Sequence, residues 1–284
     1  MKIAIFETAH FEGAYPVIRL FDDGQNDIMI CTNEQCYRQF LFLFGDDINR
    51  FSWVIQTEDE SIPQFIDRVV RTVRDRSFEF LYLNTIDNNH LFYARALARI
   101  PTVRKLLTLH DINTHFHPRP SLSIRRLVRI FGKMELLKQI NEFNVVAMPM
   151  QSFLISKLND NRPVHCVPGA VFDAADFKSP PPLESGINIV VPGSIDIKRR
   201  NYDQVFELLK LANESALPLN ITLLGGSIGT YGKEIITRCE QYAANHANLK
   251  FYKVPVVDQP KFDRVMNDAH FVFIPSVINT VISD

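Results

Sequence analysis

The residues best suited to chemistry stand where apolar runs end. One such run ends in Gly193 and Ser194, and Lys198 and Arg199 follow, just before a helical pattern. Backbone N–H groups at a helix start, with fixed cations beside them, suit a phosphate or a diphosphate. A solvated basic cap has the same composition. The position at the carboxyl end of a strand favours binding, because ligands sit there in open α/β sheets.

Two later runs end in a similar way. Gly225 and Gly226 close one of them, and Pro275 and Ser276 close another. A glycine without a Cβ lets the backbone come close to a ligand, although ordinary turn glycines look the same in a sequence. Gly225 and Gly226 are therefore further candidates for a ligand site, and Pro275 and Ser276 end a third strand of the same kind.

Two turns in the first half carry histidines. His10 follows the first apolar run and precedes Glu12 and Gly13, and His110 and Asp111 follow a central run. A histidine titrates near working pH, so it can orient or deprotonate a hydroxyl group or contact a phosphate. The alternative for each histidine is a hydrogen-bonded loop residue. A single glycine in the first turn excludes the G-x-G-x-x-G dinucleotide fingerprint.

Two more histidines raise the question of a metal. His115 and His117 lie close together, but no third ligand stands at a convincing spacing. We therefore expect neither a metal site nor a bound cofactor.

Apolar runs alternate with amphipathic segments along the chain. Helical spacing of apolar residues predicts a helix over 61–76 with Ser61 as its N-cap, and Pro16 suits the first turn of a helix after His10. Runs that are apolar throughout and separated by helices favour parallel strands covered on both faces, as in a Rossmann-like sheet. The expected strands are 2–7, 27–32, 52–56, 78–84, 105–110, 145–149, 163–168, 187–193, 220–226, 249–254 and 270–276, and the later helices lie near 201–214, 230–246 and 259–268.

The alternation is interrupted once. Residues 172–186 contain three consecutive prolines and little apolar periodicity, which is typical of a linker. We expect an N-terminal Rossmann-like domain over 1–171 and a second over 187–284, facing each other across a cleft. The second would be incomplete, because it has only four strands.

Composition limits the possible classes of function. A net charge of −1 and a pI near 6.7 provide no global attraction to nucleic acid. No apolar run reaches the roughly 18 residues of a membrane span, and the N-terminus does not resemble a secretion signal. The four cysteines lack C-x-x-C spacing. The expected location is the cytoplasm.

One segment is basic and amphipathic. Residues 119–139 carry six basic side chains against one glutamate, along an apolar stripe. A core helix with a solvated basic face explains this pattern. Peripheral contact with an anionic membrane is the alternative.

The order of PGSIDIKRR, LLGG and DAHFVFIPS resembles the donor domain of GT-B glycosyltransferases, especially the group-1 retaining family. The resemblance implies a transferase that moves a sugar from a nucleotide-diphosphate sugar to a glycan or lipid-linked acceptor, as in polysaccharide biosynthesis. Gly193, Ser194, Lys198, Arg199, Gly225, Gly226, Pro275 and Ser276 would bind the donor. His10 and His110 would be catalytic, with Glu12, Gly13 and Asp111 on the acceptor side.

The sequence departs from that family at two places. Ser194 stands where the family has an arginine, and the glutamate-containing segment expected after Pro275 and Ser276 is not seen. These departures favour an alternative, a non-catalytic nucleotide- or sugar-binding protein on the same scaffold. An epimerase or phosphorylase of this architecture would need its own carboxylate or cofactor-lysine signature, which the sequence does not display.

Overall fold

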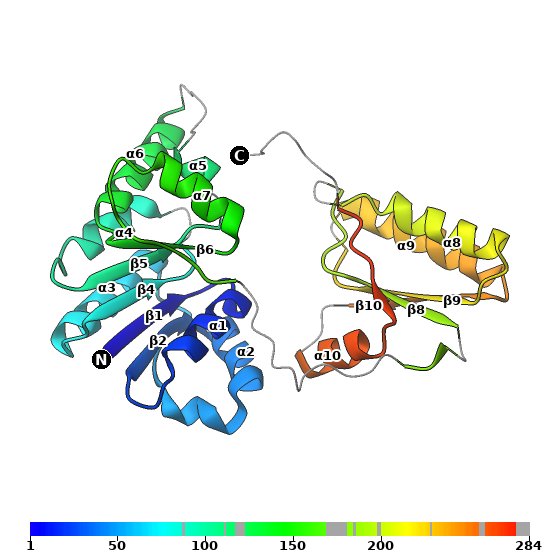
Figure 1. The fold of residues 1–284 in the computed structure, drawn as a ribbon, viewed down its shortest axis with the longest axis horizontal. Coiled ribbons are helices and arrows are strands. Elements are labelled where there is room, and N and C mark those ends of the chain that lie inside the picture. Colours follow the sequence, from blue (N-terminus) through cyan, green and yellow to red (C-terminus); the bar gives the residue numbers. More distant parts are fainter. Residues whose placement is uncertain are drawn as a thin grey trace. The chain divides into compact units, whose positions relative to one another are not determined.

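The computed structural model describes residues 1–86, 89–110, 112–116, 123–168, 181–183, 186–197, 200–227, 229–255 and 259–276. The chain divides into two compact units, Met1–Phe172 and Asp173–Ser283, drawn in Figure 1 from blue to green and from green to red. Within the described ranges, no helix combines the length and the apolarity that a membrane crossing requires.

The first unit is built on a parallel sheet. In the described part of the chain it has seven strands in the order β3-β2-β1-β4-β5-β6-β7. These strands are β1 (Lys2–Glu7), β2 (Asp27–Asn33), β3 (Ser52–Gln56), β4 (Phe80–Leu83), β5 (Arg104–Thr108), β6 (Glu142–Val145) and β7 (Val164–Cys166). The order reverses at β1 and β4, which lie side by side.

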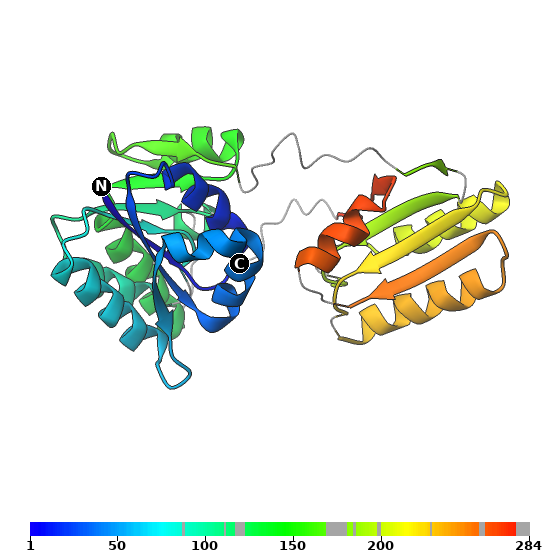
Figure 2. The same cartoon turned by 90° about the horizontal axis from the view of Figure 1, so that it is seen from below.

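Helices cover this sheet in two groups (Figure 2). α1 (Phe11–Phe21) and α2 (Glu34–Phe44) pack on one face, and α3 (Ile62–Asp75), α4 (His90–Leu97), α6 (Ile124–Lys138) and α7 (Met148–Lys157) pack on the other. The short helices η1 (Gly45–Arg50) and α5 (Asn113–Phe116) complete the described elements of this unit. Right-handed crossovers explain the division, because connections running outward from β1 in opposite directions place their helices on opposite faces.

The second unit repeats this plan on a smaller scale. Its described strands are β8 (Ile187–Pro192), β9 (Leu219–Leu224), β10 (Leu249–Val254) and β11 (Phe271–Val272), all parallel in the order β10-β9-β8-β11. α8 (Asp203–Glu214) and α9 (Gly229–Ala244) lie over one face of this sheet, and α10 (Gln259–Asn267) lies on the opposite face (Figure 1). Here the order reverses between β8 and β11.

The predicted N-cap of the helix α3 is confirmed. Ser61 is the N-cap of α3, and its backbone N–H donates to the Gln64 side-chain oxygen at 2.9 Å, as expected for a capping box. The strand predicted over 145–149 is wrong: β6 ends at Val145 and α7 begins at Met148. Proline at position 149 suits the first turn of that helix.

The start of α1 was also misplaced. The helix begins at Phe11, so Pro16 lies inside it rather than in its first turn. The predicted linker over 172–186 lies outside the described residues, apart from 181–183 and Gly186.

Candidate functional site

The first group of candidate residues lies where the first sheet reverses its strand order. His10 directly follows the turn after β1, and His110 follows β5 two positions away in the sheet. Their imidazole rings are 5.7 Å apart between centroids, and both residues are exposed. The carboxyl end of a parallel sheet at its switch point is the usual ligand position in this architecture. The structure thus brings together two histidines that are 100 residues apart in the sequence.

The two other described candidates of this unit join them from the first turn of α1. The Glu12 carboxylate lies 3.5 Å from Nδ1 of His10. A Cβ added to Gly13 would stand 3.3 Å from Nδ2 of Asn84 and 3.9 Å from Cε1 of His110, so glycine permits the close approach of α1 to this group. Asp111 lies outside the described residues.

A backbone carbonyl determines which ring nitrogen of His110 can accept a hydrogen bond from a ligand. Nε2 of His110 is 2.9 Å from the Asn84 carbonyl oxygen. A carbonyl only accepts hydrogen bonds, so Nε2 must carry the proton and donate it. In the neutral ring, Nδ1 then keeps the lone pair and is the nitrogen able to accept a proton.

Glu7, at the end of β1, supports this turn and was not among the predicted residues. It is fully buried, yet four donors reach its carboxylate. Oε1 accepts the backbone N–H groups of Ala9 and His10, and Oε2 accepts the Asn84 amide and the Thr85 hydroxyl. An ionised carboxylate offers only acceptors, which matches a site with four donors. Glu7 therefore fixes the turn that presents His10.

The polar network continues into the sheet from Asn84. The Tyr82 hydroxyl donates to Oδ1 of Asn84 at 2.7 Å and lies 2.6 Å from the Thr108 hydroxyl. The Asn144 amide in turn donates to the Thr108 hydroxyl at 3.1 Å. Burial raises the pKa of Tyr82, so its hydroxyl keeps its proton. The chain of hydrogen bonds links the turn around His10 to the centre of β6.

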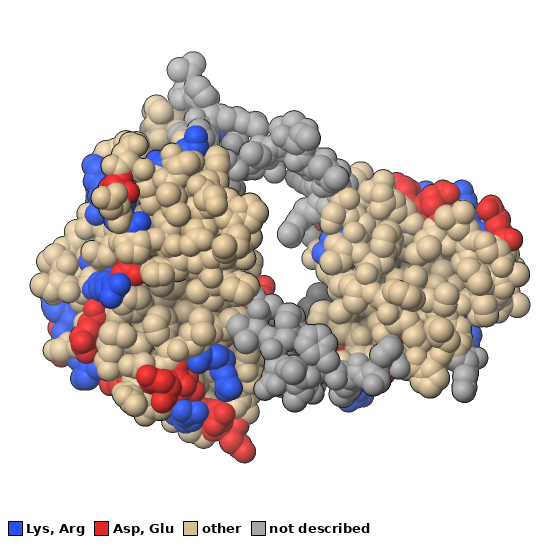
Figure 3. Space-filling view, in the orientation of Figure 1, with Lys and Arg blue, Asp and Glu red and all other residues tan. Residues whose placement is uncertain are grey.

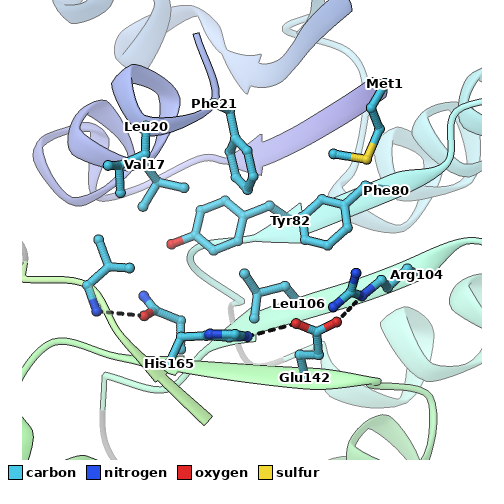
Figure 4. A pocket seen from close by; sticks show the side chains of 12 residues that line it. Met1, Val17, Leu20, Phe21, Phe80, Tyr82, Arg104, Leu106, Glu142 and His165 are labelled. Carbon is cyan, nitrogen blue, oxygen red and sulfur yellow. Dashed lines mark hydrogen bonds and ion pairs between the residues drawn. The ribbon is translucent and has the colours of Figure 1, made fainter. Parts of the chain in front are cut away.

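Below this network, a pocket of about 300 Å³ opens on the sheet face that carries α1 (Figure 4). Its walls are mostly apolar, and they come from Met1, from α1, from β4 to β7 and from Val167, which follows β7. The lining residues are Met1, Val17, Leu20, Phe21, Phe80, Tyr82, Arg104, Leu106, Glu142, Asn144, His165 and Val167. The pocket therefore shares Tyr82 and Asn144 with the hydrogen-bond network, whereas His10 and His110 do not line it.

The rim of the pocket carries a buried carboxylate between an arginine and a histidine. Glu142 accepts hydrogen bonds from Nε of Arg104 and from the His165 ring, the latter at 2.7 Å (Figure 4). Burial raises the pKa of Glu142, but these two hydrogen bonds outweigh it and hold the pKa below its ordinary value.

In the second unit, the predicted glycines meet at adjacent strand ends. Gly193 follows β8 with a φ of +102°, and its N–H donates to the Leu224 carbonyl at 2.8 Å. A Cβ on Gly225 would overlap the carbonyl oxygen of Gly193, so only glycine fits there. The N–H of Ile195 donates to the Gly226 carbonyl at 2.9 Å and joins the two turns further.

The third predicted stretch closes this group from β11. Ser276 forms an antiparallel bridge with Arg200, and the N–H of Asn201 donates to the Pro275 carbonyl at 2.8 Å. The Arg200 guanidinium donates to the Pro192 carbonyl, at the end of β8. Three stretches that are distant in the sequence therefore converge at one edge of this sheet.

Arg200 directly follows Lys198 and Arg199 in the sequence and was not among the predicted site residues, but the structure gives it a definite position. It packs against Gly193 and lies 3.4 Å from the hydroxyl of Tyr202, which is completely buried. That hydroxyl donates to the Ser194 carbonyl at 3.1 Å. Lys198 and Arg199, the predicted phosphate ligands, lie outside the described residues.

Metal-binding side chains do not gather in the described residues: no group of three or more histidine, cysteine, aspartate or glutamate side chains could hold an ion there. The ring of His115 packs against that of His90, with centroids 5.8 Å apart. His117 lies outside the described residues.

Comparisons with known proteins identify the architecture. No protein-family model and no curated protein matches the sequence. The UDP-GlcNAc 2-epimerase of Neisseria meningitidis bound to UDP-GlcNAc matches with a TM-score of 0.63 and 10% identity, over 96% of this chain and 76% of that one. The lipopolysaccharide outer core galactosyltransferase WaaB matches with a TM-score of 0.57 and 10% identity, over 97% and 74%.

A third similar structure is Anabaena HepE in complex with UDP and glucose, with a TM-score of 0.56 and 14% identity, over 96% of this chain and 73% of that one. At these identities the likeness establishes the fold alone. The chain has the GT-B architecture, with two Rossmann-like α/β units, shared by glycosyltransferases and UDP-GlcNAc 2-epimerases. The predicted fold class is confirmed.

Proposed function

We propose that the protein is a glycosyltransferase that moves a sugar from a nucleotide-diphosphate sugar to a hydroxyl group of a glycan or a lipid-linked acceptor. The observation that carries this proposal is the convergence of three strand ends in the second unit. There Gly193 and Gly225 pack backbone to backbone, with Arg200 and Ser276 beside them. Such a turn, built from glycine backbone with an arginine guanidinium against it, suits the close approach of a diphosphate.

In this proposal the second unit stabilises the leaving group. Negative charge develops on the nucleoside diphosphate as the bond to the sugar breaks, so fixed cations and N–H groups contribute most at that point. Lys198 and Arg199 would supply the cations, with Ser194 and the backbone around Gly193 as hydrogen-bond partners. In this proposal no metal ion or cofactor would be required, since Lys198 and Arg199 would provide the positive charge.

The first unit would then hold the acceptor. Nδ1 of His110 would accept a hydrogen bond from the acceptor hydroxyl, because Nε2 is engaged by the Asn84 carbonyl. His10 would line the same position, with Glu12 and Gly13 behind it. In a retaining reaction, the oxygen of the departing diphosphate takes the proton of the attacking hydroxyl. The two histidines would then orient the acceptor rather than serve as obligatory bases.

The names of the similar structures suggest the donor to test first. The Neisseria epimerase is described with UDP-GlcNAc, and Anabaena HepE is described with UDP and glucose. A UDP-sugar is therefore the first donor to try. Because UDP-GlcNAc 2-epimerases are among the similar structures, epimerisation of the donor sugar is a second candidate reaction.

The test is to incubate the full chain with UDP, UDP-glucose, UDP-galactose and UDP-GlcNAc. Thermal unfolding would measure binding, and free UDP would measure transfer or slow hydrolysis of the donor. Ligand at a hundred times its Kd should stabilise the folded state by about 2.7 kcal/mol. Release of UDP that rises with added acceptor sugar supports the transferase. Conversion of UDP-GlcNAc to its 2-epimer without UDP release identifies an epimerase instead.

Two further outcomes decide between the remaining alternatives. Binding without any turnover favours a non-catalytic nucleotide- or sugar-binding protein, and the absence of any nucleotide effect contradicts both proposals. An Arg199→Ala variant should bind UDP more weakly with an unchanged unfolding temperature in the absence of ligand. Unchanged affinity would remove Arg199 from the diphosphate site.

A further inference from the structure

The helix α6 turns large apolar side chains towards solvent. Five of them have exposed fractions between 50% and 77%: Ile124, Leu127, Val128, Phe131 and Met134. Only Gly132 and Leu136 of this helix are fully buried. Single exposed apolar residues are ordinary on a protein surface, whereas five on one helix form a surface that requires an explanation.

These five side chains form one stripe. At 100° per residue they fall within an arc of roughly 120°, about a third of the helix circumference. The helix is attached to the protein along a different side. A Cβ on Gly132 would stand 2.9 Å from the backbone nitrogen of Leu91, which shows how closely α4 approaches α6 there. The stripe is therefore distinct from the surface that joins α6 to its own unit.

The charges on α6 favour one kind of partner. Between Ile124 and Lys138 the helix carries five basic side chains and one acidic side chain, in a protein whose net charge is −1. Arg125 and Arg129 are exposed. Figure 3 shows basic side chains, with acidic ones among them, beside uncharged surface in the region where Figure 1 places α6. Binding to a protein partner would explain only the apolar stripe. Binding to an anionic lipid surface would explain both the stripe and the positive charge of the helix.

We propose that α6 is an interfacial helix that docks the first unit on an anionic membrane surface. The stripe would lie among the lipid acyl chains nearest the headgroups. Arg125, an exposed basic residue near one flank of the stripe, would extend to the lipid phosphates, because its long apolar stem lets the charged end reach the interface. This docking does not depend on which reaction the protein catalyses.

The experiment is co-sedimentation of the full chain with two kinds of vesicle. One contains phosphatidylcholine alone, and the other contains about one-third phosphatidylserine. We expect binding to the second kind, with weakening as salt rises from about 0.05 M to about 0.5 M because the charges become screened. Absence of binding to phosphatidylserine vesicles at low salt, or equal binding to both kinds, would overturn the proposal.

Matched substitutions test the surface itself. Phe131→Ser should reduce vesicle binding roughly tenfold, and Phe42→Ser on α2 is the control, because the two rings are 54% and 51% exposed. Arg125→Gln should weaken binding about fivefold and reduce its salt dependence. Far-ultraviolet circular dichroism would check that each variant is folded.

Two results would reject the assignment to α6. One is equal loss of binding in the Phe131→Ser and Phe42→Ser variants. The other is a dimer, detected by light scattering without lipid, that Phe131→Ser dissociates, since the stripe would then bind a second copy of the chain.

Discussion

Replacing Glu7 with glutamine preserves the shape of the side chain but removes part of its acceptor capacity. The carboxylate accepts four hydrogen bonds in a fully buried position. An amide has one acceptor oxygen and one N–H₂ group, which only donates. In either orientation the N–H₂ group of the glutamine faces other donors. In one orientation it faces the backbone N–H groups of Ala9 and His10, and in the other it faces the Asn84 side-chain amide.

The cost of this mismatch can be estimated from the donors that lose a partner. The Thr85 hydroxyl can rotate to accept, so the better orientation leaves unpaired only the Asn84 N–H that reached Oε2 of Glu7, while the Asn84 amide still donates to the His10 carbonyl at 3.3 Å. A buried polar group without a partner costs about 1–3 kcal/mol, and a charged acceptor contributes more than a neutral one to each remaining bond. We therefore expect Glu7→Gln to lower the free energy of unfolding of the first unit by about 2–4 kcal/mol.

The assay can be confined to that unit. Trp53 on β3 is the single tryptophan of the chain, so its fluorescence follows unfolding of the first unit. A local probe is needed because a chain with two units does not unfold in one step. The matched control is Glu12→Gln, whose side chain is 62% exposed and which should change stability by less than about 0.5 kcal/mol. A Glu7→Gln variant as stable as the control would refute the role of Glu7 as a brace.

Three further outcomes follow from other parts of the structure. Gly225→Ala should destabilise the second sheet by more than about 2 kcal/mol in hydrogen exchange, because a backbone carbonyl occupies the Cβ position. Gly229→Ala, at a φ of +66° with nothing within 4 Å of the added Cβ, should cost only about 1–2 kcal/mol. A thiol reagent at pH 8 should label half-buried Cys166 first; equally fast labelling of a second cysteine would contradict this. Burial raises the pKa of the other three thiols, to about 12 in Cys31, about 11 in Cys36 and about 12 in Cys239. Since the pKa of Glu142 is lowered in the folded state, its carboxylate stabilises the protein above the ordinary value of 4.5, and this contribution is lost as the pH falls through the lowered pKa. The stability difference between wild type and Glu142→Gln, followed by tryptophan fluorescence, should therefore shrink in acid; a difference independent of pH would contradict it.

Apolar runs and helical spacing predicted most elements because parallel strands buried on both faces are continuously apolar. The error at 145–149 has a physical cause. The apolar run does not stop where β6 ends at Val145 but continues through residues that start α7. When a helix starts directly after a strand, no polar residues mark the boundary in the sequence. Packing then decides at which residue the strand ends and the helix begins.

The candidate site was predictable only in part, because its supporting contacts are distant in the sequence. His10 and His110 each follow a strand, a local pattern that the sequence displays. Their proximity depends on β4 lying between β1 and β5, which no local pattern reveals. Glu7 reads as the last residue of a strand, and its partner Asn84 is 77 residues away. A glutamate at the end of a buried strand, directly before a histidine-bearing turn, is the signal that could have pointed to it.

The helix α6 shows that an apolar stripe in a sequence can face either the protein core or the solvent. Its sequence predicts an apolar stripe, and a core helix with a solvated basic face is the ordinary explanation. Periodicity establishes that one side of a helix is apolar, but which side faces the protein depends on where its neighbours lie. Here the close contact of Gly132 with α4 fixes the attachment on another side, and Phe131 and Leu127 are left exposed. If the stripe instead binds a second copy of the chain, the contact at Gly132 still determines which residues of α6 are exposed for that binding.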